Sequence, residues 1–272
     1  MGGQFFIYDA YPYSFKEYLT AQQVELREHW EYDAIQRSEV KRHLNEYFYY
    51  GGLPEILSFK NKRAMFSSLY QKIYLGDICA RNNIKNDRVL NILIKKMAES
   101  VKQPLSYNRL KNVIVATGAP ISVPTTIDYV DYTSDSWLIL PMENEIGKLT
   151  EKEMQKKYYF VDNGLLNLFL MNSETSLLEN MVAVELCRRF GKKNVFFLNA
   201  EKEIDFIVPD EKLAIQVSYS IKDETTYNRE VPPLAKYDKA HEDWKCLLIT
   251  YDEEGTEGGT LVVPVWKWLM EV

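Results

Sequence analysis

Two short alternating runs near the C-terminal end, EIDFIV and LAIQVSY, flank a polar turn and carry side chains that could share one site. The first run contains Asp205, and the second contains Gln216 and Ser218. If residues 209–212 form the turn of a hairpin, Asp205 lies opposite Gln216 with a Cβ separation of about 4.5–5.5 Å. Gln216 and Ser218 are two residues apart, so they point to the same face of their strand. This spacing predicts the geometry of a carboxylate metal site.

An apolar helix over SLLENMVAVELCRRF precedes the hairpin and offers a further acid, Glu179. Glu179 lies on an apolar stripe, where a carboxylate needs a partner or a function. Two interpretations are open: Glu179 is a site residue beside Asp205, or it is satisfied locally by Ser176, which has capping-box spacing to it. Glu185 on the same helix has a structural explanation in Arg189, four residues later.

A working metal site of this kind needs more charge than these residues offer. Mg²⁺ prefers hard, anionic oxygen ligands, whereas the carbonyl group of Gln216 is neutral. Ser218 cannot place a positive charge beside a phosphate or an attacking water, as a lysine could. We therefore interpret the hairpin as the relic of a metal site. Its candidate site residues are Glu179, Asp205, Gln216 and Ser218, and its candidate metal ligands are Glu179 and Asp205.

The elements that would position these residues follow a helical N-terminal half. Ser14 and Glu17 form a capping-box signature, and helical periodicity continues from residue 14 to about residue 75. Residues 87–136 indicate three helices, and the apolar runs LILPM and KYYFV then indicate a hairpin with a long charged connection. Three helices followed by a hairpin predict a helix-turn-helix with a wing.

The C-terminal part alternates strands with helical segments. NVFFLN, EIDFIV, LAIQVSYS, CLLITYD and TLVVPV are strand-like, and a helix-like segment around TTYNREVPPLAKY interrupts them. This order predicts an α/β core with a mixed sheet. The expected fold class is therefore a multidomain α+β or α/β protein: a helical segment, a winged helix, and a mixed sheet with flanking helices.

Composition limits the functional classes. The 272 residues carry a net charge of −6, with 46% hydrophobic and 26% charged residues, as in ordinary folded proteins. Apolar runs are too short for a membrane span, and three widely spaced cysteines offer no zinc-ligand spacing. We expect reduced thiols and a cytoplasmic location, with no membrane partner.

The order of LLENMVAVEL, FFLNAEKEIDFIV and LAIQVSYS resembles the restriction-endonuclease-like fold of the PD-(D/E)xK superfamily. Over nearly its full length the chain also resembles the C-terminal part of prokaryotic AAA-type ATPases that carry the DUF4143 domain. The motifs that carry this likeness are YPYSFKEYL, YFYYGGLPEIL, YLGDICARNNI, KKYYFVDNGLL and LLENMVAVEL.

The resemblance implies three parts: residues 1–75 as the remnant of an ATPase helical lid, 76–170 as the winged helix, and 171–272 as the nuclease-like domain. It implies that Glu179 and Asp205 match the nuclease acids, whereas Gln216 and Ser218 stand where the pattern has an acid and a lysine. Residues 4–9, QFFIYD, would be the last strand of an ATPase core. No phosphate-binding GxxxxGK[ST] motif occurs, so we expect no bound nucleotide.

DNA binding by the winged helix is disfavoured by charge. The candidate recognition helix, residues 122–137, carries Asp128, Asp131 and Asp135 and no lysine or arginine. Carboxylates beside phosphates are repelled, and no bidentate guanine reader is present. The candidate nucleic-acid contacts are instead Lys156 and Lys157, near the wing.

The leading hypothesis is therefore a non-catalytic C-terminal module of an AAA-type ATPase that docks a partner or nucleic acid. The ATPase module would lie in the same chain or in a separate one, and self-association stays open. The first alternative is a divalent-metal nuclease that uses Glu179 and Asp205, with Mg²⁺ as its cofactor. The second is a DNA-binding regulator that uses the winged helix.

Overall fold

A computed structural model describes residues 9–171, 173–200 and 203–271. The strand predicted over residues 4–9 lies outside these residues, apart from Asp9. Within the described part of the chain, no helix has both the length and the apolar character needed to cross a membrane.

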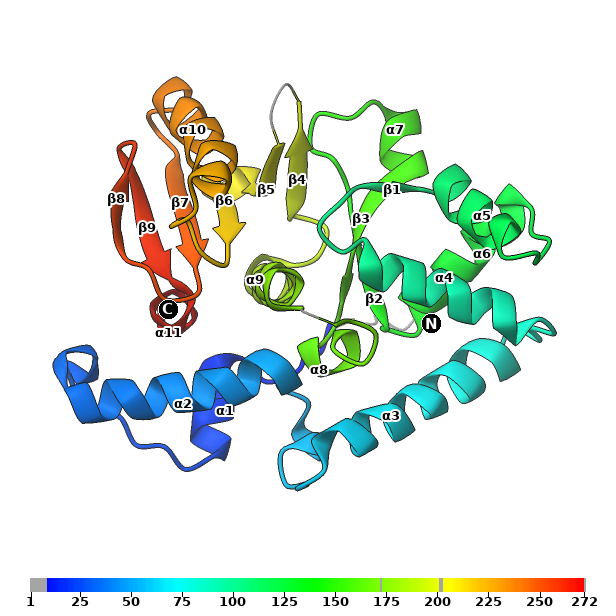
Figure 1. The fold of residues 1–272 in the computed structure, drawn as a ribbon, viewed down its shortest axis with the longest axis horizontal. Coiled ribbons are helices and arrows are strands. Elements are labelled where there is room, and N and C mark those ends of the chain that lie inside the picture. The colour runs from blue at the N-terminus through cyan, green and yellow to red at the C-terminus, as the bar shows by residue number, and fades with distance from the viewer. Residues whose placement is uncertain (1–8, 172, 201–202, 272) are drawn as a thin grey trace, which may run out of the picture.

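A mixed sheet of six strands forms the C-terminal part of the fold (Figure 1). Its order is β4 (Phe196–Asn199), β5 (Glu203–Val208), β6 (Leu213–Ser218), β7 (Lys245–Thr250), β9 (Thr260–Pro264) and β8 (Gly255–Glu257). Strands β6, β7 and β9 are parallel, and the remaining neighbours are antiparallel. The prediction of a mixed sheet from five strand-like runs is thus confirmed.

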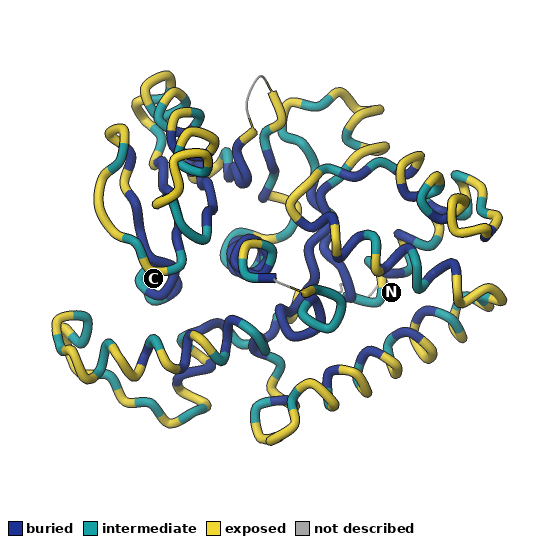
Figure 2. The backbone as a smooth tube through the Cα atoms, viewed as in Figure 1, coloured by how far each residue is buried: buried dark blue, intermediate teal, exposed yellow. Residues whose placement is uncertain are grey.

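Helices cover both faces of this sheet. Helix α10 (Glu224–Ala240) packs on one face through a small apolar cluster that includes Ile207, Ala214 and Leu248. Helices α9 (Glu174–Phe190) and α11 (Val265–Met270) contact the sheet through the larger core, to which Phe206 and Ile215 belong. Neighbouring residues along β5 and β6 alternate between these clusters, because successive side chains of a strand point to opposite faces. Figure 2 shows α9 as a mainly buried helix near the centre of the molecule.

The hairpin of β5 and β6 has the predicted register. Val208 pairs with Leu213 and Phe206 pairs with Ile215, around a short 3₁₀ turn, Pro209–Glu211. The turn closes through Lys212, whose φ of 49° lies in the left-handed region. This register sets Asp205 next to Gln216, as expected.

Three helices precede a second, smaller sheet. They are α4 (Asp87–Glu99), α5 (Tyr107–Ala116) and α6 (Val123–Asp135), each beginning after an Asn or Ser N-cap. The sheet has the order β1 (Leu105–Ser106), β3 (Gln155–Phe160) and β2 (Ile139–Met142), and it is antiparallel. A short helix, α7 (Leu149–Met154), leads into β3. The three predicted helices and the hairpin that follows them are confirmed.

The two sheets are joined along the outer edge of β4. After β2, the peptide N–H of Glu145 donates to the carbonyl of Phe197 at 2.8 Å, and that of Phe197 donates to Glu143 at 3.0 Å. The side chain of Asn144 accepts from the N–H of Asn199 at 3.0 Å. Helix α9 reinforces the connection because it contacts both β6 and β3. The smaller sheet is therefore fixed to the larger one.

The N-terminal helices lie along one side of the molecule, below α9 and α11 in the view of Figure 1. They are α1 (Phe15–Ala21), α2 (Ala34–Tyr50) and α3 (Lys62–Lys72), which continues into a π-helical segment, Ile73–Ala80. The capping box predicted at Ser14 and Glu17 is present, with Ser14 N–H donating to Glu17 at 2.7 Å. The boundary expected between residues 75 and 76 falls inside the continuous helical stretch of α3 and its π segment.

Two motifs that are far apart in the sequence, GGLPE and VDNGLL, meet at a buried carboxylate. Asp162 caps the short helix α8 (Asn163–Leu166) by accepting from Gly164 N–H at 2.7 Å. Its other oxygen accepts from Gly52 N–H at 2.8 Å. Burial raises the pKa of Asp162 to about 7, although these backbone donors oppose the shift. Asp162 thus fastens the end of α2 to the segment after β3.

Candidate functional site

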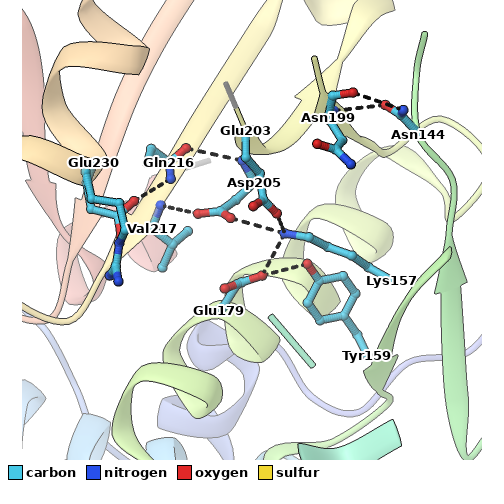
Figure 3. Close-up of polar contacts among 11 residues, drawn as sticks. Asn144, Lys157, Tyr159, Glu179, Asn199, Glu203, Asp205, Gln216, Val217 and Glu230 are labelled. Atoms are coloured by element: carbon cyan, nitrogen blue, oxygen red, sulfur yellow. Dashed lines mark hydrogen bonds and ion pairs between the residues drawn. The ribbon is translucent and has the colours of Figure 1, made fainter. Parts of the chain in front are cut away.

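The predicted acids do meet, but around a lysine that was not assigned to their site. Glu179 from α9, and Glu203 and Asp205 from β5, surround the side-chain nitrogen of Lys157 from β3 (Figure 3). The Lys157 Nζ atom lies 3.2 Å from Glu179 Oε1, 2.9 Å from Glu203 Oε1 and 3.2 Å from Asp205 Oδ1. We call these four side chains the lysine–acid cluster.

The charged groups of the cluster are buried, so each of them needs its ion-pair partner to offset the loss of hydration. The Lys157 side chain has no exposed surface, and the side chains of Glu179 and Asp205 are only 4% and 9% exposed. Glu203 is the member that reaches solvent, with 41% of its side chain exposed. Charges taken out of water need paired, hydrogen-bonded partners, and removing one partner costs more than the pair itself contributes.

Glu179 is held by groups from the smaller sheet. Its Oε1 atom accepts from the Tyr159 hydroxyl at 2.9 Å as well as from Lys157. The alternative in which Ser176 caps Glu179 is wrong, because α9 begins earlier, after Ser173, and Ser176 lies within the helix. The structural pairing of Glu185 is confirmed, since Arg189 Nε donates to it at 2.5 Å.

Asp205 is fixed on its other side by the hairpin. Its Oδ2 atom accepts from Val217 N–H at 3.0 Å, and its own N–H donates to Gln216 Oε1 at 3.3 Å. The Gln216 amide in turn donates to Glu230 of α10 at 2.5 Å. Gln216 therefore uses both ends of its amide in protein hydrogen bonds (Figure 3). These two hydrogen bonds fix the orientation of the Gln216 amide between Asp205 and Glu230.

Ser218 lies beside these residues without joining the cluster. It is buried at the end of β6, and its hydroxyl donates to the carbonyl of Ser220 at 3.0 Å. The four predicted site residues are thus brought to one region. Glu179 and Asp205 share the lysine, Gln216 supports Asp205, and Ser218 serves the turn after the strand.

The pKa values of Glu179 and Lys157 reflect several carboxylates that face one buried ammonium. Burial and the neighbouring charge of Asp205 raise the pKa of Glu179 to about 8, against the opposing effects of Lys157 and Tyr159. Burial alone would lower the pKa of Lys157, but the carboxylates, Glu179 foremost, hold that pKa well above its usual range. Lys157 is therefore charged at neutral pH, and the cluster has a tendency to bind one more proton.

An open cleft of about 460 Å³ borders the cluster. Glu179, Glu203 and Asp205 line it, together with Gln216 and Glu230. The other lining residues are the cations Lys102 and Arg229 and the polar or apolar residues Gln103, Thr175, Val217, Ser218, Tyr219, Asn228 and Pro233. Burial and the charge of Asp205 raise the pKa of Glu230, although Gln216 and Arg229 oppose this. The lining of the cleft therefore combines four carboxylates with two cations and several apolar side chains.

Divalent metal binding requires a set of acids free to turn toward one ion. Among the described residues, no group of three or more His, Cys, Asp and Glu side chains is arranged to hold a metal. The acids that come nearest to such a group, Glu179, Glu203 and Asp205, all direct an oxygen at the Lys157 ammonium. The ammonium therefore occupies the position between carboxylates that a cation would otherwise take.

The two lysines predicted to contact nucleic acid have different surroundings. Lys157 points into the interior, so its ammonium has no exposed surface to offer a phosphate. The side chain of Lys156 is 15% exposed and pairs with Glu143 at 3.2 Å and Glu153 at 3.7 Å. Alternation along β3 separates these neighbours. Alternation alone does not tell which lysine lies inside, because Tyr158 on the Lys156 face is as buried as Tyr159 on the Lys157 face.

Residues 41–176 match the family described as "Domain of unknown function (DUF8612)". An uncharacterised protein of Methanocaldococcus jannaschii is 30% identical over 94% of this chain and 62% of its own length. An uncharacterised protein of Haemophilus influenzae is 29% identical over the whole chain and 66% of its own length. The chain thus spans a little under two thirds of these relatives. No solved structure matches it.

Proposed function

The chain belongs to the DUF8612 family, and we propose that it is a non-catalytic docking module whose nuclease-like acids now serve as a structural joint. The observation that carries this proposal is the Lys157 ammonium, which contacts Glu179, Glu203 and Asp205 at 2.9–3.2 Å. In this proposal the lysine–acid cluster replaces metal coordination by an internal ion-pair network.

The proposed arrangement combines the three parts expected from the resemblance to AAA-type ATPases with a DUF4143 domain. The N-terminal helices would be the lid remnant, and α4, α5, α6 and the smaller sheet would form the winged helix. The six-stranded sheet with α9 and α10 would be the degenerate nuclease-like domain. Lys157 lies on the winged-helix side and the acids on the nuclease-like side, so the cluster supports a fixed relation between the two.

In this proposal the chain binds a partner on behalf of an ATPase module, which lies in the same polypeptide or in a separate one. The joined sheets support this role, because a rigid body transmits force and position better than a flexible pair of domains. The hydrogen bonds of Glu143, Glu145 and Asn144 with β4 also hold the segment that would be the wing. A wing held in this way is less available to a DNA groove, which disfavours the DNA-binding regulator.

A divalent-metal nuclease is the second candidate, and one observation favours it. Lys157 brings a positive charge within 3.2 Å of Asp205, which is the kind of charge that Ser218 cannot supply. A metal-loaded state would require the carboxylates to turn from the ammonium toward the ion and the lysine to face the phosphate. The complete set of contacts made by the buried ammonium favours the structural function.

We expect no DNA or RNA cleavage above background when the purified chain is incubated with Mg²⁺ or Mn²⁺. Loss of a group that stabilises developing charge commonly reduces a rate by about 10²–10³-fold, and in this cluster the lysine charge is neutralised by acids. The measurement is an endonuclease assay on supercoiled plasmid and on labelled single strands. Asp205→Ala is the control: metal-dependent cleavage that this substitution abolishes would establish the nuclease and overturn the docking proposal.

A further inference from the structure

The cleft beside the lysine–acid cluster is one positive charge short of neutrality. Among the described residues, its lining and the cluster together contain four carboxylates and three cations: Glu179, Glu203, Asp205 and Glu230, and Lys102, Lys157 and Arg229. The side chains of Glu179, Asp205 and Glu230 are less than a tenth exposed, whereas that of Arg229 is 70% exposed. A cation that reaches these acids leaves bulk water and therefore gains more from each contact.

One buried oxygen of the cleft is left without a donor. Glu179 uses its Oε1 atom for both of its hydrogen bonds, from Lys157 and from Tyr159. Within the described part of the chain its Oε2 atom accepts none, and Figure 3 shows this atom directed away from Lys157. A buried, ionised carboxylate needs donors to offset its lost hydration. The Oε2 atom of Glu179 is thus an acceptor that a ligand in the cleft can use.

The acids of the cleft are held by separate partners on different elements. Lys157 binds Glu179 of α9, and the Gln216 amide donates to Glu230 of α10 at 2.5 Å. Carboxylates fixed in this way are not free to converge on one metal ion. A planar guanidinium group suits them better, because its five N–H donors point in several directions. It also stacks on aromatic rings, and Tyr219 lines the same cleft.

We propose that this cleft binds a guanidinium group, with the carboxylates of Glu179 and Glu230 as its acceptors. The bound cation supplies the positive charge that the cleft lacks, so Glu179 is ionised in the complex. The inference rests on the proposed docking function, because an arginine side chain of a docked partner presents this group. A small guanidinium compound presents the same chemistry.

The test titrates the full chain with short blocked peptides in metal-free buffer. One peptide has an arginine between two glycines, and its counterpart has citrulline, a neutral side chain of the same shape, in place of arginine. Calorimetry at pH 8 should show saturable binding of the arginine peptide, at least about tenfold tighter than of the citrulline peptide, because charged hydrogen bonds are the stronger ones. Equal affinity of the two peptides would overturn the inference.

Binding should strengthen as the pH rises. Lys157 and Tyr159 from β3 and Asp205 from β5 face Glu179, whose pKa is about 8, and the pKa of Glu230 is raised as well. A guanidinium group stays charged throughout this range. Because it binds the ionised carboxylates, its affinity should be at least about fivefold higher at pH 9 than at pH 6.5. Glu179→Gln should remove most of this dependence, and an affinity that is constant or falls with pH in the natural chain would contradict the site.

Substitutions of single acids locate the ligand. Glu230→Gln removes an acceptor and should weaken binding of the arginine peptide at least about fivefold. Glu203→Gln, at a side chain that is 41% exposed, tests the same charge without disturbing a buried contact of α10 and should also weaken binding. Glu211→Gln is the matched control at an exposed turn position and should leave the affinity within about twofold. Circular dichroism verifies folding, and an affinity unchanged by both cleft substitutions would exclude this cleft.

Methylguanidinium separates the two sources of the group. Tighter binding of the arginine peptide assigns the cleft to a partner's side chain, and equal affinity of methylguanidinium assigns it to a small compound; both results support a guanidinium site. Absence of saturable binding of either cation would remove the site and leave the docking function standing. Metal-dependent cleavage that Asp205→Ala abolishes would instead remove the docking function, whatever the titrations show.

Discussion

Replacing Lys157 with methionine is expected to lower the free energy of unfolding by about 3–5 kcal/mol at pH 7. Methionine keeps an unbranched apolar side chain but removes the ammonium, so Glu179, Glu203 and Asp205 lose their shared counter-ion. Because the pKa of Glu179 is about 8 in the natural chain, its carboxyl ionises beside the ammonium only as the pH rises through 8; without the ammonium this ionisation is opposed, so the loss should be larger at pH 9 than at pH 7. Urea denaturation at the two pH values measures both effects.

The neighbouring residue provides a matched control. Lys156→Met removes pairs with Glu143 and Glu153, whose side chains are 38% and 62% exposed. Ion pairs with such exposed partners contribute about 0–1 kcal/mol, so this variant should unfold within about 1 kcal/mol of the natural chain. Equal effects of the two substitutions would contradict a structural function for the lysine–acid cluster.

Replacing Gly51 with alanine is expected to destabilise the protein by about 2–4 kcal/mol. Gly51 has a φ of 65° and a ψ of −159°, a combination that is essentially restricted to glycine. A Cβ atom at this position would also lie 2.1 Å from a carboxylate oxygen of Asp162. The new methyl group would therefore push apart the contact between the end of α2 and the segment after β3. Thermal and urea unfolding measure the loss.

Gly76→Ala is the control for this second prediction. Gly76 lies in the π-helical segment, and a Cβ atom there would meet no atom within 4 Å. Alanine costs a helix about 1 kcal/mol less than glycine, so this variant should be neutral or slightly more stable. Destabilisation by Gly76→Ala as large as that by Gly51→Ala would show that a general intolerance of larger residues, and not the Asp162 contact, explains the loss.

Local patterns predicted most of the elements, because their signals lie within a few residues. Ser14 and Glu17 marked a helix start, and alternation in EIDFIV and LAIQVSY gave the strands and the register that brings Asp205 to Gln216. The three helices before the smaller sheet were visible from their apolar periodicity and their breaks at proline and glycine. Helix starts, strands and the hairpin register, which depend on residues close together in the chain, could thus be predicted from the sequence alone.

The composition of the site was only partly accessible, because its decisive residue comes from a distant element. Lys157 and Asp205 are separated by 48 positions, and they meet because the two sheets are joined along β4 and through α9. The capping interpretation of Glu179 failed for a local reason, since the helix begins three residues earlier than expected, but its actual partners, Tyr159 and Lys157, also lie on a separate element, β3. Spacing along the chain cannot reveal a contact that depends on how two sheets are joined.

If the hairpin descends from a nuclease, as proposed, the lysine that is absent at position 218 has a counterpart in Lys157 from β3. Lys157 lies between Glu179 and Asp205 and bonds to both acids. In this proposal its ammonium takes the place that a metal would occupy in a working nuclease.

A calorimetric titration of the natural chain with Mn²⁺ tests this central claim most directly. Because the Lys157 ammonium already occupies the space between Glu179 and Asp205, we expect no saturable binding with a dissociation constant tighter than about 1 mM. Asp205→Asn should behave in the same way, since neither chain offers a free set of carboxylates. Stoichiometric binding of Mn²⁺ at micromolar concentration, lost in Asp205→Asn, would contradict the claim and show that the acids form a metal site.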